Sequence, residues 1–434
     1  MLKRNIILLF IFFTYIILSN LYFVHKIYNT KNTYGQRRHR IAGEVTSFVR
    51  KMSRGRIKFT VKTSAINNKS IKEKISVVIY EDKLKPISFG KKIEISAPIK
   101  KINTLKDFLI YNTFYYIKDP NLGNIKSVSQ GGKLRTTIQK ARYFIIQRLF
   151  KLHKNDSKRF VPSFILGDKN LITKDEEEVI RKNGISHILV VSGTHVGLLI
   201  AFVFAMCFGK KNMKTLTIVL VVSWIYVFLN GFSVSCMRAV IMFNFATFAY
   251  ILERDYSPLY ALLLAAAFIL LFSPSTIFSI GFQFSFFATF GILYYFTIVE
   301  KVFMFMPAIF RKPLALTTSA QIGLAPIIFY YFTKLSIVSF ISNIFVVPLV
   351  FLIMIVGISA FLGSLIFMPL GILIAFLNDT LMKLFLLILN TFAKFPYVYI
   401  EIENLPLYSV FLYYGVMLSA PIIYKKFSKR YNNI

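Results

Sequence analysis

Residues 184–197 read Gly-Ile-Ser-His-Ile-Leu-Val-Val-Ser-Gly-Thr-His-Val-Gly and open a long apolar segment. This segment nevertheless carries two imidazoles, His187 and His195, which are costly at membrane depth unless they face protein or a water-filled space. Its glycines let two backbones approach closely or let a helix break. The sequence therefore predicts a membrane protein that binds or passes a polar substrate in its interior.

The composition of the whole chain agrees with this interpretation. Of its 434 residues, 56% are hydrophobic and 46 are Phe. Apolar runs of about 17–25 residues recur from residue 185 to the C-terminus, and this length crosses ~30 Å of hydrocarbon. We expect a polytopic α-helical membrane protein with about ten transmembrane helices, some of them broken or re-entrant. The expected spans are 4–24, 185–208, 214–230, 235–252, 257–273, 276–299, 315–332, 335–365, 370–393 and 406–424.

One of these spans is too long for a single membrane crossing. Residues 335–365 as one helix would extend about 46 Å at the rise of an α-helix. Asn343 and Pro348 lie within the span, and we expect a break or a re-entrant element there. Non-helical backbone at that depth is tolerated only where it lines a cavity or is buried in protein.

The Lys and Arg residues of the short loops predict the orientation of the chain. With ten spans, the basic loops between 208 and 312 and the basic tail fall on one side, and this side is the cytoplasm by the positive-inside rule. Both termini are therefore expected in the cytoplasm, and the long segment after the first helix outside it.

That long segment has the pattern of a small β domain. Residues 57–61, 75–79 and 93–97 alternate between apolar and polar side chains, and Gly55, Asn67 and Gly90 stand between them. Four or five short strands fit a small barrel of the oligonucleotide/oligosaccharide-binding type. The expected domains are an N-terminal transmembrane anchor (1–30), an extracytoplasmic OB-like β domain (35–118), amphipathic or interfacial helices (119–184), a transmembrane domain (185–425) and a basic tail (426–434).

The net charge of the chain is +34, and about +23 of it lies between residues 31 and 160, with 31 Lys or Arg and 8 Asp or Glu. Such a block attracts a polyanion, which means nucleic acid or anionic lipid headgroups. Phe114, Tyr115 and Tyr116 either stack on bases or form an aromatic belt at the membrane interface. The candidate DNA-binding residues are Arg50, Lys51, Arg54, Arg56, Lys58, Lys91 and Lys92.

Further polar residues recur inside the later spans. Taken singly, each has a structural explanation, since an arginine can snorkel, amides can join helices and prolines can kink them. Five such clusters in successive spans instead suggest one shared polar interior. The candidate channel-lining residues are His187, Ser192, Gly193, His195, Arg238, Gln283, Ser285, Gln321, Asn343 and Pro348.

At this point the residues resemble a known family. Leu166-Gly-Asp168 followed by residues 184–197 closely resembles the signature of the ComEC/Rec2 competence proteins. The later clusters follow in that family's order, and the resemblance covers roughly residues 35–365. They are Ser-x-x-x-Arg238-Ala, Ser273-Pro with Gly281-Phe-Gln283-x-Ser285-Phe, Ala320-Gln321 to Pro326, and Asn343 to Pro348.

The resemblance implies a channel in the bacterial inner membrane that passes single-stranded DNA into the cytoplasm during natural transformation. It implies contact with membrane lipids, and as partners a separate nuclease, a DNA receptor and a cytoplasmic motor. Many members carry a C-terminal metallo-β-lactamase-like domain, and we expect a short form without it. The five histidines make no His-x-His-x-Asp-His cluster, so we expect no catalytic residues, no metal and no cofactor.

Two other functions remain open from the sequence. A transporter or flippase for a small or lipidic anion would use the same polar interior, with broken helices presenting their N-termini to the anion. An intramembrane serine hydrolase would use Ser192 as the nucleophile and a histidine as the base, since Ser192 and His195 are one helical turn apart. One helix rarely supplies both groups without an orienting residue and an oxyanion hole.

Overall fold

The computed structural model of the chain describes most residues from 38 to 419. The described residues are 38–46, 50–51, 56–71, 73–80, 90–101, 115–118, 125–130, 133–210, 212–395, 399–402, 406, 408–410, 412–417 and 419. The expected first helix (4–24) and the basic tail lie outside them. The chain divides into two compact units: residues 1–173, 188–282 and 351–382 form the first, and residues 174–187, 283–350 and 383–434 form the second.

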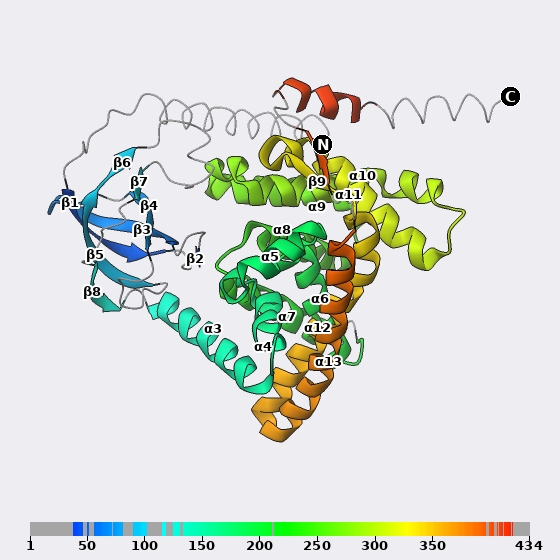
Figure 1. Ribbon diagram of the computed structural model, residues 1–434, viewed down its shortest axis with the longest axis horizontal. Coiled ribbons are helices and arrows are strands. Elements are labelled where there is room, and N and C mark those ends of the chain that lie inside the picture. Colours follow the sequence, from blue (N-terminus) through cyan, green and yellow to red (C-terminus); the bar gives the residue numbers. More distant parts are fainter. Residues whose placement is uncertain are drawn as a thin grey trace. The chain divides into compact units, whose positions relative to one another are not determined.

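The first unit contains an eight-stranded sheet, drawn in blue and cyan in Figure 1. Its strand order is β6-β7-β4-β3-β1-β5-β8, and β2 pairs with β3. The pairs are antiparallel except for β4 and β7, which run parallel. The strands are β1 (Arg38–Val45), β2 (Arg50–Lys51), β3 (Arg56–Ile66), β4 (Lys74–Tyr80), β5 (Lys91–Pro98), β6 (Lys100–Lys101), β7 (Tyr115–Lys118) and β8 (Ile125–Gln130).

The alternating residues predicted as strands do form the core of this sheet. Phe59 of β3, Val77 of β4 and Ile95 of β5 are buried with their alternating neighbours in one apolar cluster. Burying such a side chain contributes about 1.5–3 kcal/mol, which is why a two-residue period fixes the face of each strand. The sheet continues to Gln130, beyond residue 118. The OB-like barrel remains a prediction, because no pairing between described strands joins β6 to β8.

Tyr115 belongs to the same core and corrects one expectation. It is 5% exposed and packs among the buried residues of the sheet, so the prediction that it stacks on bases is wrong. Tyr116 follows on the opposite face of β7 and is half-buried. Phe114 lies outside the described residues.

Five of the described helices are long and apolar enough to cross a membrane. They are α8 (Val234–Ile251), α10 (Ile280–Val302), α11 (Ala308–Phe332), α12 (Ser339–Ile366) and α13 (Met368–Ala393). Three shorter apolar helices are α6 (Gly193–Met206), α7 (Met213–Leu229) and α9 (Pro258–Phe272). The chain is therefore a membrane protein with a sheet region before its apolar helices, and the number of ten spans remains a prediction.

Two expected spans have a different form. The span at 185–208 is not one helix: a 3-10 turn, η3 (Ser186–Leu189), is followed by non-helical residues and then by α6. The expected break at Asn343 and Pro348 is also wrong, because α12 runs without interruption through both. The span is shorter than expected, since residues 334–336 form β9, which pairs with β10 (Tyr399–Glu401). A proline removes one backbone hydrogen bond, and the remaining bonds of a helix of 28 residues keep it continuous.

The segment 119–184, where amphipathic or interfacial helices are expected, contains α3 (Lys133–Leu152). Arg148 of this helix and His153, which follows its last residue, bond to the α12–α13 hairpin. Arg148 Nε donates to Ser364 Oγ at 3.1 Å, and Asn378 Nδ2 donates to His153 Nε2 at 3.2 Å. Burial lowers the pKa of the His153 imidazole below its ordinary 6.5, so the ring is neutral and its other nitrogen bonds to the carbonyl of Leu149.

In the second unit, α10 and α11 cross with their backbones in contact. A Cβ atom built on Gly291 would lie 2.4 Å from the carbonyl oxygen of Ser319, and one built on Gly323 would lie 2.3 Å from that of Phe287. Small residues at a crossing allow such close packing of membrane helices. Tyr414 strengthens the pair, because its hydroxyl donates to the carbonyl of Gly323 at 2.9 Å.

We predict that Gly291→Ala destabilises the protein by about 1–3 kcal/mol, because backbone atoms cannot yield to the new methyl group. The measurement is the thermal unfolding midpoint of the protein in detergent. Gly281→Ala on the same helix is the matched control, since no heavy atom lies within 4 Å of its Cβ position. Equal midpoints for the two variants would contradict the close crossing.

Candidate functional site

The first turn of α6 lies in the middle of the histidine-containing segment. Ser192 is its N-cap, with an extended backbone at φ −109° and ψ 172°. Ser192 and His195 form a reciprocal capping box, in which the backbone N–H of Ser192 donates to His195 Nδ1 at 3.2 Å. The hydroxyl of Ser192 also lies 2.8 Å from this nitrogen. These two side chains satisfy backbone groups that a helix beginning among apolar residues would otherwise leave without partners.

This geometry bears on the predicted nucleophile. The lone pair of His195 Nδ1 that would take a proton from the Ser192 hydroxyl already accepts the Ser192 N–H. The pair therefore acts first as a helix cap, which disfavours the hydrolase among the three functions. In the described part of the chain, no group of three or more His, Cys, Asp and Glu residues could hold a metal ion.

Arg238 packs directly on this first turn. It lies in the first turns of α8, is 8% exposed, and its Nη2 would stand 2.5 Å from a Cβ atom on Gly193. Gly193 therefore has no side chain where the guanidinium passes. The turn between α7 and α8 brings Arg238 there, because Gly231 and Phe232 both adopt positive φ and reverse the chain sharply.

The other six predicted lining residues lie in the second unit. Ser285 is 8% exposed on α10, and Gln283 of the same helix is hydrogen-bonded to Tyr331. Gln321 Nε2 of α11 donates to Ser339 Oγ at 3.4 Å. The remaining three are Asn343, which is half-buried, and Pro348 and His187, which are exposed.

Two amides of this group have an oxygen with no hydrogen-bond partner among the described residues. They are Oε1 of Gln321 and Oδ1 of Asn343, and both atoms are buried. A buried carbonyl-type oxygen without a donor costs about 1–3 kcal/mol, unless water or a polar ligand supplies the bond. These helices thus offer neutral acceptors to water or to a polar ligand.

Serines join the start of α12 to the segment before His187. Ser336 Oγ donates to the carbonyl of Lys182 at 2.7 Å, and Ser342 Oγ donates to that of Asn183 at 2.9 Å. Gly184, at φ +70°, follows the end of the helix α5 (Lys174–Lys182), and the space beside Ser339 has no room for a Cβ on this residue. The glycine of the histidine segment therefore leaves room for the side chains of Ser336 and Ser339.

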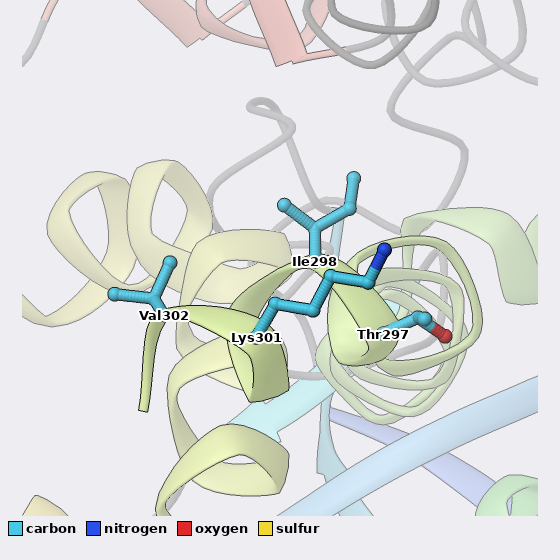
Figure 2. A pocket seen from close by; sticks show the side chains of 4 residues that line it. All are labelled: Thr297, Ile298, Lys301 and Val302. Atoms are coloured by element: carbon cyan, nitrogen blue, oxygen red, sulfur yellow. The ribbon is translucent and has the colours of Figure 1, made fainter. Parts of the chain in front are cut away.

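The structure brings together only part of the predicted site. Ser192, Gly193, His195 and Arg238 form one group in the first unit, while the amides and hydroxyls of the second unit contact partners of their own. A separate shallow hollow is lined by Thr297, Ile298, Lys301 and Val302 (Figure 2). These four side chains come from one face of α10, so the hollow contains none of the predicted residues.

The Lys and Arg residues of the sheet that are predicted to bind DNA lie at two places. β2 and β3 place Arg50 opposite Lys58, and β5 begins with Lys91 and Lys92. Lys92 stands opposite Glu44 of β1, and this carboxylate weakens its attraction for an anion. Lys51 and Arg56 belong to β2 and β3, whereas Arg54 lies outside the described residues.

The alternation also contains a basic pair that was not singled out. Lys62 of β3 stands opposite Lys74 of β4, and both side chains are exposed. Glu44 of β1 stands opposite Lys62 on its other side, so Lys74 is the less compensated of the two. Like charges directly across β3 and β4 repel each other, and an anion beside the pair would be stabilising. The two-residue period of β3 and β4 could have identified this pair.

Comparison with known proteins identifies the family of the chain. The family model described as Competence protein matches residues 164–427, which is more than half of the chain. The chain belongs to the competence protein family. The predicted ComEC/Rec2 resemblance is thereby confirmed, and the matched range contains the segment from Leu166 to Asp168 and the histidine motif.

Two curated relatives extend this comparison. ComE operon protein 3 of Bacillus subtilis (strain 168) is 24% identical over 393 residues, which are 87% of this chain and 50% of the relative. Recombination protein 2 of Haemophilus influenzae is 26% identical over 200 residues, which are 42% of this chain and 25% of the relative. The chain thus spans half or less of the length of these relatives. No solved structure matches the chain.

We predict that Ser192→Asn keeps the stability of the protein, whereas Ser192→Ala lowers it by about 1 kcal/mol. Asparagine caps a helix as well as serine does but cannot act as a nucleophile. The measurement is the thermal midpoint of both variants in detergent. Wild-type stability of Ser192→Ala would show that the hydroxyl is not needed for the cap.

Proposed function

We propose that this protein is a channel of the bacterial inner membrane that takes up single-stranded DNA during natural transformation. The observation that carries the proposal is the position of Arg238 on the first turn of α6. A helix N-terminus carries a partial positive charge and free N–H groups, so it attracts phosphate groups. A guanidinium at the same place adds a full charge and a planar set of donors.

The environment of Arg238 increases the effect of its charge. The cluster of Val191, Val196, Tyr226, Cys236 and Val240 surrounds the start of α6 with buried apolar side chains. Electrostatic attraction is stronger in such surroundings than in water. A phosphodiester that reaches this point would therefore be attracted strongly by a buried cation.

The polar groups of the second unit suit the passage of a polymer. Gln283, Ser285, Gln321 and Asn343 offer neutral donors and acceptors on helices that are otherwise apolar. Conduction requires sites that bind weakly enough for the substrate to leave. Neutral hydrogen-bonding groups meet that requirement better than a row of charges would.

The sheet would capture the strand before it enters the helices. Phosphates are attracted by its lysines and arginines without regard to base sequence, and this attraction weakens with salt. We place the sheet outside the cytoplasm and both termini inside it. A nuclease, a DNA receptor and a cytoplasmic motor are proposed partners, and the surrounding lipids are the proposed environment of the apolar helices.

The transporter or flippase for a small anion remains the main alternative, because it would use the same buried arginine. The two functions differ in whether they need the sheet. A small anion does not require an eight-stranded sheet with basic side chains to bind it. Deletion of the gene, followed by a transformation assay with labelled DNA, separates them. Undiminished uptake in the deletion strain would end the channel proposal.

We predict that Gly193→Ala reduces DNA uptake by about tenfold, because a methyl group at this position displaces the Arg238 guanidinium. The matched control is Gly197→Ala, one turn further along α6, where no atom lies within 4 Å of the Cβ position. Uptake of labelled DNA is measured in cells with equal amounts of each variant in the membrane. Equal uptake by the two variants would remove Arg238 from the path.

We predict that replacing Lys62 and Lys74 by Gln weakens the binding of single-stranded DNA to the full protein and makes it less dependent on salt. Each phosphate contact that is lost lowers the slope of log K against log salt by about 0.7. The measurement is a salt titration of labelled oligonucleotide binding in detergent. Lys312→Gln, which changes an exposed lysine in the first turns of α11, is the control and should leave the slope unchanged.

A further inference from the structure

α3 carries a buried arginine that the proposed path does not use. Arg142 is 6% exposed. Its Nη1 donates to the carbonyl oxygens of Leu166 and Leu229, at 3.1 and 3.0 Å. Its Nη2 pairs with the carboxylate of Asp168 at 3.1 Å. One guanidinium thus holds three acceptors from segments that are far apart in the sequence.

Two of these acceptors are helix ends. Leu166 is the last residue of α4 (Ser157–Leu166), and Leu229 is the last residue of α7. The last carbonyl groups of a helix have no partner within it and carry a partial negative charge. Arg142 therefore caps the C-termini of two helices at once, and the carboxylate of Asp168 compensates its buried charge.

Both capped ends lead to the first turn of α6. Gly167 follows Leu166 at φ +62°, and a Cβ atom there would lie 2.6 Å from the side chain of Val191. On the other side, Ser233 follows the α7 turn, and its hydroxyl donates to the carbonyl of Val191 at 3.4 Å. Val191 immediately precedes the cap residue Ser192, so the two segments that Arg142 joins also enclose the start of α6.

A second contact holds the same segments together. The hydroxyl of Tyr226, on the last turn of α7, donates to the carbonyl of Ile165 at 2.7 Å. Tyr226 also belongs to the apolar cluster that contains Val191 and Val196. A shift of the C-terminal end of α4 or α7 would therefore displace the residues that begin α6.

We propose that Arg142 is a positioning residue for the α6 site: by capping α4 and α7 it fixes Val191 and, through it, the first turn on which Arg238 packs. This inference rests on the proposed function where it concerns DNA uptake. Two residues separate α3 from β8, the last strand of the sheet. Arg142 thus lies on the helix that follows the sheet in the sequence and precedes the α6 site.

The test uses Arg142→Lys, because an ammonium group cannot present the planar set of donors that reaches all three acceptors. Trp224 is the only tryptophan of the chain and packs against the cluster that contains Val191, so its fluorescence reports on this packing. We expect its emission to shift to longer wavelength in Arg142→Lys. DNA uptake should fall by about tenfold, while oligonucleotide binding to the full protein stays normal.

Two variants on the same helix serve as controls. Lys140→Gln changes an exposed charge, and Arg148→Lys removes a bond to Ser364 of α12 instead. Both should keep the wild-type emission of Trp224. Wild-type emission in Arg142→Lys would overturn the proposal, whatever its uptake.

Two further outcomes also have a definite interpretation. If Arg142→Lys does not reach the membrane, Arg142→Gln replaces it, because one amide group also cannot donate to all three acceptors. An unchanged Trp224 emission in that variant would overturn the proposal. If the wild-type protein takes up no DNA, the proposed function fails, while the emission of the Arg142 variant still decides whether this residue positions the start of α6.

Discussion

A helix that begins inside an apolar segment must find partners for the backbone N–H groups of its first turn. This constraint governs the region around α6, where the chain leaves a 3-10 turn and starts a new helix among buried valines and leucines. Ser192 and His195 meet it by capping each other's backbone, and Gly193 leaves room for Arg238. The polar residues that mark the segment are thus explained first by the geometry of a helix start, and this start is what gives the buried arginine its place.

The sheet and most helices could be predicted from the sequence, because each follows a period that burial imposes. The alternation of Ile57, Phe59 and Val61 identified β3 and its face. The break expected at Pro348 was wrong because a single missing hydrogen bond does not interrupt a long apolar helix. The order of the strands and the parallel pairing of β4 with β7 depend on contacts between distant residues, which no local pattern contains.

The candidate site could be predicted in its residue types but not in its organisation. The histidine motif pointed to Ser192 and His195, yet their mutual capping depends on where α6 begins, and this boundary was misplaced. Arg142 was missed because α3 contains many basic residues. A signal was nevertheless present: Arg142 is four residues after Ile138 and seven before Leu149, on the face of the helix that is buried. A charged residue in line with buried apolar ones was the feature to look for.

The crossing of α10 and α11 limits how the second unit can move. At Gly291 and Gly323 the two backbones touch without side chains between them, and the hydroxyls of Tyr413 and Tyr414 bind the carbonyls of Ile322 and Gly323 from a third segment. Sliding or rolling one helix over the other would drive carbonyl oxygens into α-carbons. α10 and α11 must therefore move together as one rigid body. Any widening between helices of this unit has to occur where other helices pack against this pair.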